Sequence, residues 1–205
     1  MSLGLGFVVR KCGQLVDGAT AVVSDQHLAT EAAATGYRGH RGATGVPRSG
    51  DVCRYLPFEP MDEQVLAARL AGDLGRREIS AEGQALTLGA ELAASGRLVG
   101  DVTLFFHSAR HAGGEIGYAF HPDIAGQGYA TEACTAVLNL AFDEFDGLGL
   151  HRVVARMDAR NSASARLASR LGMRREAHHR SSEMFKGEWA DVVVYALLDY
   201  EWHAR

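Results

Sequence analysis

The sequence has little of what marks a disulfide-rich or zinc-binding protein. Its three cysteines, Cys12, Cys53 and Cys134, are widely separated, odd in number and never in a C-x-x-C pair. Neither a disulfide framework nor a zinc site fits this spacing. We therefore expect reduced thiols and a cytoplasmic protein.

An excess of positive charge is also missing. Lysine and arginine total 21 against 25 for aspartate and glutamate, which gives a formal charge of -4, and no basic block occurs. Binding to a nucleic-acid backbone needs clustered positive charge, so we expect no nucleic-acid partner. No apolar run approaches the ~20 residues that span a bilayer, and the first residues lack a secretory cleavage pattern, so we expect no membrane association.

The sequence does contain enough apolar residues for one substantial core. With 205 residues, 47% of them apolar, it is expected to form one domain with an extra segment. Residues 51–205 make up the domain, and residues 1–50 have little periodicity. Within this first segment we expect two short strands and a loop, at 5–9, 21–23 and 36–50.

Two segments outside the centre of the chain have the apolar spacing of helices. The first is 61–77, which follows a compact apolar segment at 52–58. The second begins after Asn161 or Ser162, either of which is a good N-cap, and ends at Gly172.

Strand patterns occupy five further segments: 85–92, 97–106, 150–157, 173–178 and 191–198. Ser95-Gly96 is a suitable hairpin turn between the first two. Residues 107–114 are expected to form a polar loop, and the tail 199–205 has no assignment. The order of elements predicts an α/β fold, a mixed sheet covered by helices.

The stretch from residue 113 to residue 145 carries the clearest functional signal. Ile116, Tyr118 and Phe120 alternate with less apolar residues, which predicts a strand at 115–120. After a turn, apolar residues recur three or four positions apart, as on one face of a helix. That face comprises Ala130, Ala133, Cys134, Val137, Leu138, Ala141 and Phe145.

The turn between this strand and this helix is Ala125-Gly126-Gln127-Gly128-Tyr129-Ala130. A helix N-terminus presents unpaired N–H groups and the positive end of the helix dipole, and glycine lets a phosphate approach closely. The turn is therefore a candidate pyrophosphate site. A tight turn that binds nothing explains two glycines equally well.

Four segments together resemble the GCN5-related N-acetyltransferase (GNAT) superfamily, and within it the ribosomal-protein alanine N-acetyltransferase-like branch. They are VCRYLPFEPM, EIGYAFHPDIAGQGYATEA, RMDARNSASARLASRLGMRREA and FKGEWADVVVYALL, in the family's order and spacing. The resemblance implies a mostly antiparallel mixed sheet with a splayed central pair of parallel strands and helices on both faces. It also implies acetyl-CoA as cosubstrate, an amine as acceptor, and a homodimer as the suitable assembly.

The superfamily's acetyl-CoA signature is Arg or Gln, two residues, Gly, one residue, then Gly or Ala. It falls here on residues 125–130, and only its first position departs, because Ala125 replaces Arg or Gln. The resemblance implies that backbone N–H groups of residues 126–130 hold the pyrophosphate, so the departure should weaken the site without abolishing it. Gln127 is a candidate to compensate.

Further site residues follow from the same resemblance. The pantetheine arm would pair with the strand near Ala119 and Phe120, one of whose N–H groups would meet the oxyanion. Asn161 resembles a cofactor contact and Ser164 a hydroxyl near the thioester sulfur, although helix capping explains both. Many relatives in the wider superfamily have, at the position of Ala168, a tyrosine that acts as the general acid. Because this residue is alanine here, Ser164 or bound water would protonate the thiolate.

Acetyl transfer also requires a neutral amine. Glu115 stands where relatives often have a carboxylate near the acceptor, so it is a candidate base, acting directly or through water; a solvated strand end is the alternative. An α-amino group has a pKa of about 7.7–8.0 against about 10.4 for lysine, which favours a protein or peptide N-terminus as acceptor. An aminoglycoside or polyamine acceptor, and a non-catalytic acyl-CoA-binding module, are alternatives.

Histidines invite a metal interpretation at six positions: His107, His111, His121, His151, His178 and His179. Adjacent residues on a strand face opposite sides, so His178 and His179 make a poor bidentate site, and we expect no metal. Trp189, Phe185 and Tyr195 are expected to pack a hairpin near the acceptor.

Overall fold

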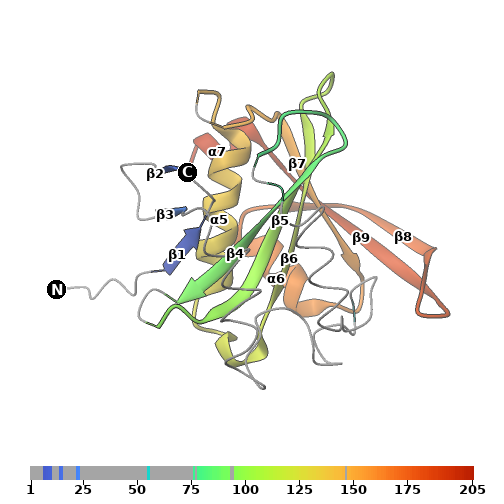
Figure 1. Ribbon diagram of the computed structural model, residues 1–205. Helices are drawn as coiled ribbons and strands as arrows, with labels where there is room; N and C mark the ends of the chain where they lie inside the picture. The colour runs from blue at the N-terminus through green and yellow to red at the C-terminus, as the bar shows by residue number, and fades with distance from the viewer. Residues whose placement is uncertain are drawn as a thin grey trace.

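The computed structural model describes residues 7–10, 14–15, 22–23, 55, 76, 78–92, 95–145 and 147–205 (Figure 1). Apart from Tyr55 and Arg76, the segments interpreted at 36–50, 52–58 and 61–77 lie outside these residues. In the described part, seven strands form one sheet in the order β1-β4-β5-β6-β7-β9-β8. Neighbouring strands are antiparallel except for β6 and β7, so the predicted mixed sheet is confirmed.

The N-terminal strands are short. β1 (Phe7–Arg10) pairs with β4 along one edge of the large sheet, while β2 (Gln14–Leu15) and β3 (Val22–Val23) pair with each other. The strands predicted at 5–9 and 21–23 overlap β1 and β3. The two-residue β2 was not predicted.

Three antiparallel strands form the middle of the sheet: β4 (Ala85–Leu92), β5 (Leu98–Ser108) and β6 (Gly113–Phe120). The structure has β4 at the predicted bounds, but the polar loop predicted at 107–114 is wrong. The strands take up half of it, leaving only residues 109–112 between β5 and β6. Polar residues do not prevent pairing there, because a strand needs only its backbone groups for the ladder.

Gly114 is a position in β6 where a side chain would not fit. An added Cβ would lie 2.7 Å from Leu150 Cδ1 and 2.7 Å from the Phe105 carbonyl oxygen. Gly117, three residues further along β6, differs: there a Cβ would lie 3.5 Å from Phe105 Cε2, an ordinary contact distance. Close packing of β6 against its neighbours therefore depends on glycine at Gly114.

Helix α5 (Tyr129–Phe142) buries the predicted face, with Ala133, Cys134, Val137, Leu138, Ala141 and Phe142 inside. The prediction that Phe145 shares this face is wrong, because Phe145 lies beyond the helix and is 93% exposed. Asp143 causes the early end: its backbone is extended and its Oδ1 accepts the N–H of Phe145 at 2.8 Å. Aspartate commonly competes with helical bonding in this way.

The C-terminal part of the chain completes the sheet. β7 (Arg152–Asp158) leads to α6 (Ser162–Arg170), then to the hairpin of β8 (Arg174–Phe185) and β9 (Glu188–Leu198), and to α7 (Asp199–His203). The strands predicted at 173–178 and 191–198 are both too short, because the hairpin extends to a turn at Lys186-Gly187. The unassigned tail is helical; Glu201 Oε2 accepts the N–H of Leu198 at 3.0 Å and so begins α7.

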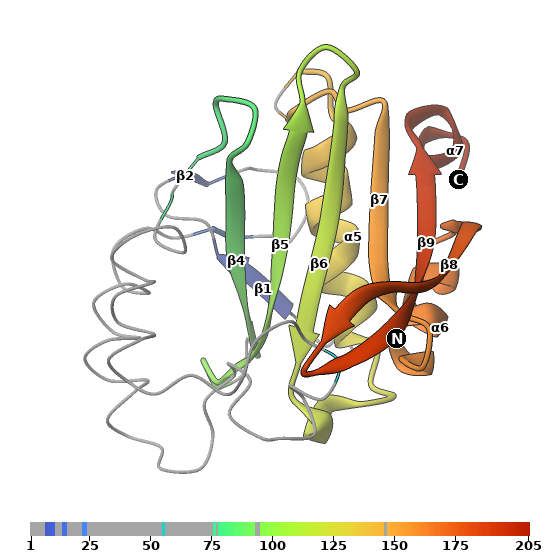
Figure 2. The same ribbon diagram turned by 90° about the vertical axis from the view of Figure 1, so that its right-hand side faces the viewer.

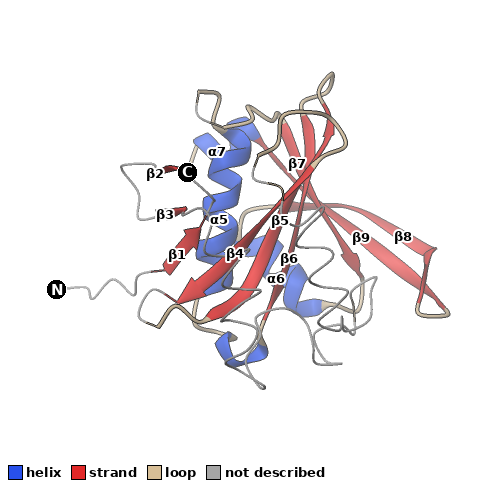
Figure 3. Cartoon of the chain, in the orientation of Figure 1, coloured by secondary structure: helices blue, strands red, loops and turns tan. Residues whose placement is uncertain are grey.

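The core lies between the sheet and the helices. Figure 2 shows α5 behind the middle strands, with α6 and α7 toward β9, and Figure 3 shows the helices and the strands in the orientation of Figure 1. The largest fully buried side chains include Leu104, Ile116, Leu138, Phe142 and Leu197. Among the described residues, no helix is both long enough and apolar enough to cross a membrane.

Candidate functional site

The two central parallel strands pair briefly and then separate. Pairing of β6 with β7 ends at Glu115 opposite Val154, although both strands are described throughout and both continue (Figure 2). We call residues 116–120 of β6 and 155–158 of β7 the splay. At about 3.3 Å per residue, its β6 side is roughly 16 Å long. The splayed pair expected from the resemblance is therefore confirmed.

Alternate residues of β6 present their backbone groups to the splay. The N–H of His121 donates to the C=O of Val99, on the β5 side, at 2.8 Å. In an antiparallel ladder, residues that bond to the partner strand alternate with residues that face away. Ala119 therefore faces β5, whereas Tyr118 and Phe120 face the splay. Of the two predicted pantetheine contacts, only Phe120 has its backbone N–H on the β7 side.

The glycine turn follows the end of β6 where the splay is widest. Gly126 and Gly128 have φ values of +77° and +87°, and a Cβ added to either would meet no atom within 4 Å. The first hydrogen bond of α5 runs from the N–H of Glu132 to the C=O of Gly128 at 3.1 Å. The N–H groups of Ala130 and Thr131 therefore have no acceptor within the helix. Bare backbone and unpaired donors together suit an anion.

Two side chains, Gln127 and Arg97, bind Asp123 just before this turn and stabilise it. After the short helix η3 (Pro122–Ile124), Gln127 Nε2 donates to the C=O of Asp123 at 2.9 Å, so this amide is used inside the turn. Arg97 Nη2, from the β4–β5 hairpin, lies 3.1 Å from Asp123 Oδ2. Arg97 is thus paired with a carboxylate just before the turn, and Ala125 at the exposed first position of the turn contributes no cation.

Asp158 shapes the loop between β7 and α6. Its side chain is 1% exposed, and Arg160 Nη2 and Nε donate to the carboxylate at 2.7 and 3.0 Å. These hydrogen bonds lower the pKa of Asp158 below its ordinary value and outweigh the opposing effect of burial. The charge-assisted pair of Arg160 and Asp158 therefore fixes the conformation of the loop.

Helix α6 begins with the pair of residues predicted for the site. Asn161 is the N-cap, and its Oδ1 accepts the N–H of Ser164 at 3.1 Å. The capping role foreseen for Asn161 is thus present. Ala168 is fully buried.

Tyr118 joins β6 to α6. It lies in the splay on the same face of the sheet as Ile116 and the helices, and its hydroxyl donates to the C=O of Ser164 at 3.1 Å. Burial raises the pKa of the Tyr118 phenol far above its ordinary value, and the neighbouring Cys134 adds to this effect. The phenol therefore stays protonated and remains a donor at neutral pH.

Glu115 lies on the opposite face of the sheet, at the point where β6 and β7 separate. Its side chain is 23% exposed, and its Oε2 is 3.1 Å from Nε2 of His107 on β5. The ring of His107 stacks on that of Phe105, with centroids 6.0 Å apart. Glu115 is thus a partly buried carboxylate with a titratable neighbour, which differs from a fully solvated strand end.

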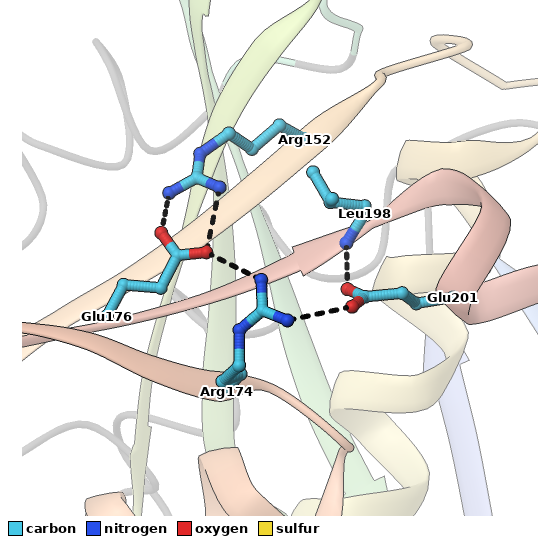
Figure 4. Close-up of polar contacts among 5 residues, drawn as sticks. All are labelled: Arg152, Arg174, Glu176, Leu198 and Glu201. Atoms are coloured by element: carbon cyan, nitrogen blue, oxygen red, sulfur yellow. Dashed lines mark hydrogen bonds and ion pairs between the residues drawn. The ribbon is translucent and has the colours of Figure 1, made fainter.

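Ion pairs fasten the strands on the far side of the splay (Figure 4). Arg152 on β7 forms a bidentate pair with Glu176 on β8, and Arg174 Nη2 reaches the same carboxylate at 3.3 Å. Arg174 Nη1 also lies 3.6 Å from Oε1 of Glu201 in α7. The hydrogen bonds from Arg152 lower the pKa of Glu176. The network ties β7, β8 and α7 together beside the site.

Four histidines of the described part of the chain, His107, His121, His151 and His178, each lie beside a single carboxylate. His178 Nε2 is 2.7 Å from Asp191 Oδ2, and His151 Nδ1 is 3.1 Å from Asp199 Oδ2. Within the described residues, no group of three or more His, Cys, Asp or Glu side chains is arranged to hold a metal ion.

The predicted residues therefore surround one feature, the splay. The turn 125–130 lies at its wide end, Ser164 over its helix face, and Glu115 at its narrow end on the other face. Sequence reasoning missed the contact of His107 with Glu115 and the contact of Tyr118 with α6. Strand alternation was the available signal for Tyr118, since it places this residue on the face of Ile116.

Comparison with known proteins identifies this arrangement. The family model for the acetyltransferase (GNAT) domain matches residues 46–174. The "Uncharacterized N-acetyltransferase YnaD" of Bacillus subtilis is 35% identical over 52% of this chain and 60% of its own length. The "Putative ribosomal N-acetyltransferase YdaF" of the same organism is 31% identical over 54% of this chain and 58% of its own. The chain thus spans about three fifths of these relatives.

Solved structures share the fold. An acetyltransferase of the GNAT family from Bacillus anthracis has a TM-score of 0.70 at 24% identity and covers 96% of each chain. A chimera of spermidine N-acetyltransferase SpeG from Vibrio cholerae and hSSAT has a TM-score of 0.62 at 20% identity over 74% of this chain and 86% of its own. The matched domain, the splayed sheet and the glycine turn agree, and the chain belongs to the acetyltransferase (GNAT) domain family.

Proposed function

We propose that the protein is an acetyl-CoA-dependent N-acetyltransferase whose acceptor is the α-amino group of a protein or peptide N-terminus. The observation that carries this proposal is the splay, with an anion-binding turn at one end and polar side chains on each face. The GNAT domain family uses acetyl-CoA as cosubstrate. The assignment of the chain to the ribosomal-protein alanine N-acetyltransferase-like branch is part of the proposal.

The residues of the turn fit the pyrophosphate of this cosubstrate. The backbone N–H groups of Gly126, Gly128, Tyr129 and Ala130 would donate to its oxygens, whereas the N–H of Gln127 already donates to the C=O of Ile124 at 3.3 Å. The two glycines leave the approach free of Cβ atoms. Because Ala125 brings no cation and Gln127 is engaged by Asp123, backbone donors would supply most of the affinity. Arg97 would add electrostatic attraction from the other side of the turn.

The unpaired edge of β6 fits the pantetheine arm. Amide groups of the arm would pair with backbone groups of Phe120 and Tyr118 in the manner of an added strand. Ala119 would contribute through its small side chain, and Asn161 would line the α6 side. The acetyl group would then lie beyond these residues toward Glu115.

The chemistry requires one bond to form and one to break. The acceptor nitrogen would bond to the acetyl carbon and the carbon–sulfur bond would break, while an N–H of the splay meets the oxyanion. Glu115, directly or through a water, would take the proton of the amine, and His107 at 3.1 Å would pass it toward solvent. Ser164 Oγ, or water bound there, would protonate the thiolate on the opposite face.

Two considerations favour an N-terminal α-amine. Its pKa of about 7.7–8.0 leaves a useful neutral fraction at pH 7, so one carboxylate suffices as base, whereas lysine at about 10.4 demands more. The relative YdaF carries the description "Putative ribosomal N-acetyltransferase". Spermidine acetyltransferases share the fold, so a polyamine is the second acceptor to test.

The test has a binding step and a transfer step. Calorimetry with acetyl-CoA should give saturable binding, and mass spectrometry should show one acetyl group on peptides but little on spermidine or aminoglycosides. Glu115→Gln should lower kcat by about 10²–10⁴ while the Kd for acetyl-CoA is unchanged. The matched control is Glu188→Gln, at an exposed strand end, which should leave kcat unchanged.

Each other outcome has a distinct meaning. Absence of acetyl-CoA binding refutes the proposal as a whole. Binding without transfer to any amine supports a non-catalytic acyl-CoA-binding module, and transfer to spermidine alone supports the polyamine acceptor. A homodimer remains a prediction, which light scattering on the purified protein would test.

A further inference from the structure

Beyond Glu115, hydrogen bonds between strands no longer set the spacing of β6 and β7. The parallel ladder stops there, and among the described strands β6 then pairs with β5 alone. Tyr118, three residues further along β6, connects this strand to helix α6, which follows β7 in the chain. Its hydroxyl donates to the C=O of Ser164 in the first turn of α6 at 3.1 Å.

Ser164 is consequently held from two sides. Its N–H donates to Asn161 Oδ1 at 3.1 Å, and its C=O accepts the Tyr118 phenol at 3.1 Å. With both backbone groups engaged, the position of its Cα and the direction of its Cβ are constrained. Asn161 and Tyr118 come from different elements, so the constraint joins α6 to β6.

We infer that Tyr118 is a positioning residue: its phenol acts through Ser164, fixing the hydroxyl over the splay at the height needed to meet the thiolate. This inference rests on the proposed function. Tyr118 does not itself donate a proton to the thiolate, because its hydroxyl already donates to the C=O of Ser164. Burial among neighbours that include Cys134 raises the pKa of the phenol and keeps it protonated.

Removal of the Tyr118 hydroxyl oxygen tests the hydrogen bond from Tyr118 to the C=O of Ser164, which we call the tether. Tyr118→Phe keeps the ring and deletes only the donor, and Tyr200→Phe, at an exposed position on α7, is the matched control. A group displaced by about 1 Å costs roughly 10²-fold in rate. We therefore expect Tyr118→Phe to lower kcat by about 10- to 100-fold, with the KM for the acceptor and the Kd for acetyl-CoA within about threefold of wild type.

A double-mutant cycle separates action through Ser164 from general loosening. In the Ser164→Ala background, Tyr118→Phe should cause no further loss of kcat, because the hydroxyl that it positions is gone. If the two losses instead multiply, or if KM rises while kcat is unchanged, the inference is overturned.

Hydrogen exchange provides a readout that needs no activity. Amides in the first turn of α6 should exchange faster in Tyr118→Phe than in wild type, and Tyr200→Phe should leave them unchanged. Unchanged exchange in Tyr118→Phe would overturn the tether. A wild-type protein that binds and transfers nothing would refute the proposed function, and the exchange result would still decide whether Tyr118 holds Ser164.

Discussion

Replacing Gly128 with alanine should separate the structural role of the turn from its role in binding. Gly128 has a φ of +87°, and a Cβ there meets no protein atom within 4 Å. The methyl group therefore collides with nothing in the protein, but it would project into the space from which a phosphate approaches. Gly83, with a φ of +83° and equally open surroundings, lies before β4 at the opposite end of the sheet and serves as the matched control.

The two variants should lose similar stability. Alanine in the left-handed region costs about 1–2 kcal/mol, since its Cβ crowds its own carbonyl. For a domain of this size, each kcal/mol lowers Tm by about 2–4 °C, so both variants should melt roughly 2–8 °C below wild type. Only Gly128→Ala should weaken acetyl-CoA, by about tenfold or more, which corresponds to about 1.4 kcal/mol.

Calorimetric titration with acetyl-CoA and thermal denaturation of the three proteins provide the comparison. Equal losses of affinity in Gly128→Ala and Gly83→Ala would show that general destabilisation explains the effect. Unchanged affinity in Gly128→Ala, with the expected loss of Tm, would refute the placement of the pyrophosphate at this turn.

The remaining predictions concern stability. Gly114→Ala should lower the free energy of unfolding by about 1–3 kcal/mol through overpacking, whereas Gly117→Ala should stay within about 0.5 kcal/mol of wild type. Urea denaturation measures both, and equal losses of stability in the two variants would contradict the packing argument. Asn161→Ala should cost about 0.5–2 kcal/mol through loss of the helix cap, and no change in urea midpoint would refute that role. Because Arg160 lowers the pKa of Asp158, this pair stabilises the fold above the ordinary carboxyl pKa of about 3.9, and the contribution disappears as pH falls through the lower native pKa. Asp158→Asn should therefore destabilise strongly at pH 7 and much less near pH 2; a loss independent of pH would contradict the linkage.

Local patterns predicted the central elements of the fold well. The alternation around Ile116 and the helical spacing from Ala133 to Ala141 each reflect burial against one core, so periodicity was sufficient. Boundaries failed where a single side chain decided them. The early end of α5 depends on the Asp143 side chain. The β5–β6 loop is short because backbone pairing continues to Ser108 and Gly113, and the polarity of the side chains does not reveal this.

The candidate site divides in the same way. The turn and the α6 cap are contiguous in sequence, so glycine spacing and capping residues pointed to them. His107 and Tyr118 contact residues 8 and 46 positions away, and strand register and helix placement create those contacts. A pattern in a single sequence does not show which residues of two strands, or of a strand and a helix, lie opposite each other. The contacts of His107 and Tyr118 are therefore seen only in the folded chain.

Amide hydrogen exchange of the wild-type protein with and without acetyl-CoA tests the central claim most directly. The account predicts slower exchange at Gly126, Gly128 and Ala130 and at the splay-facing amide of Phe120, with little change at Ala119, which already faces β5. Protection confined to surfaces outside the turn and the splay, or none at saturating acetyl-CoA, would contradict it.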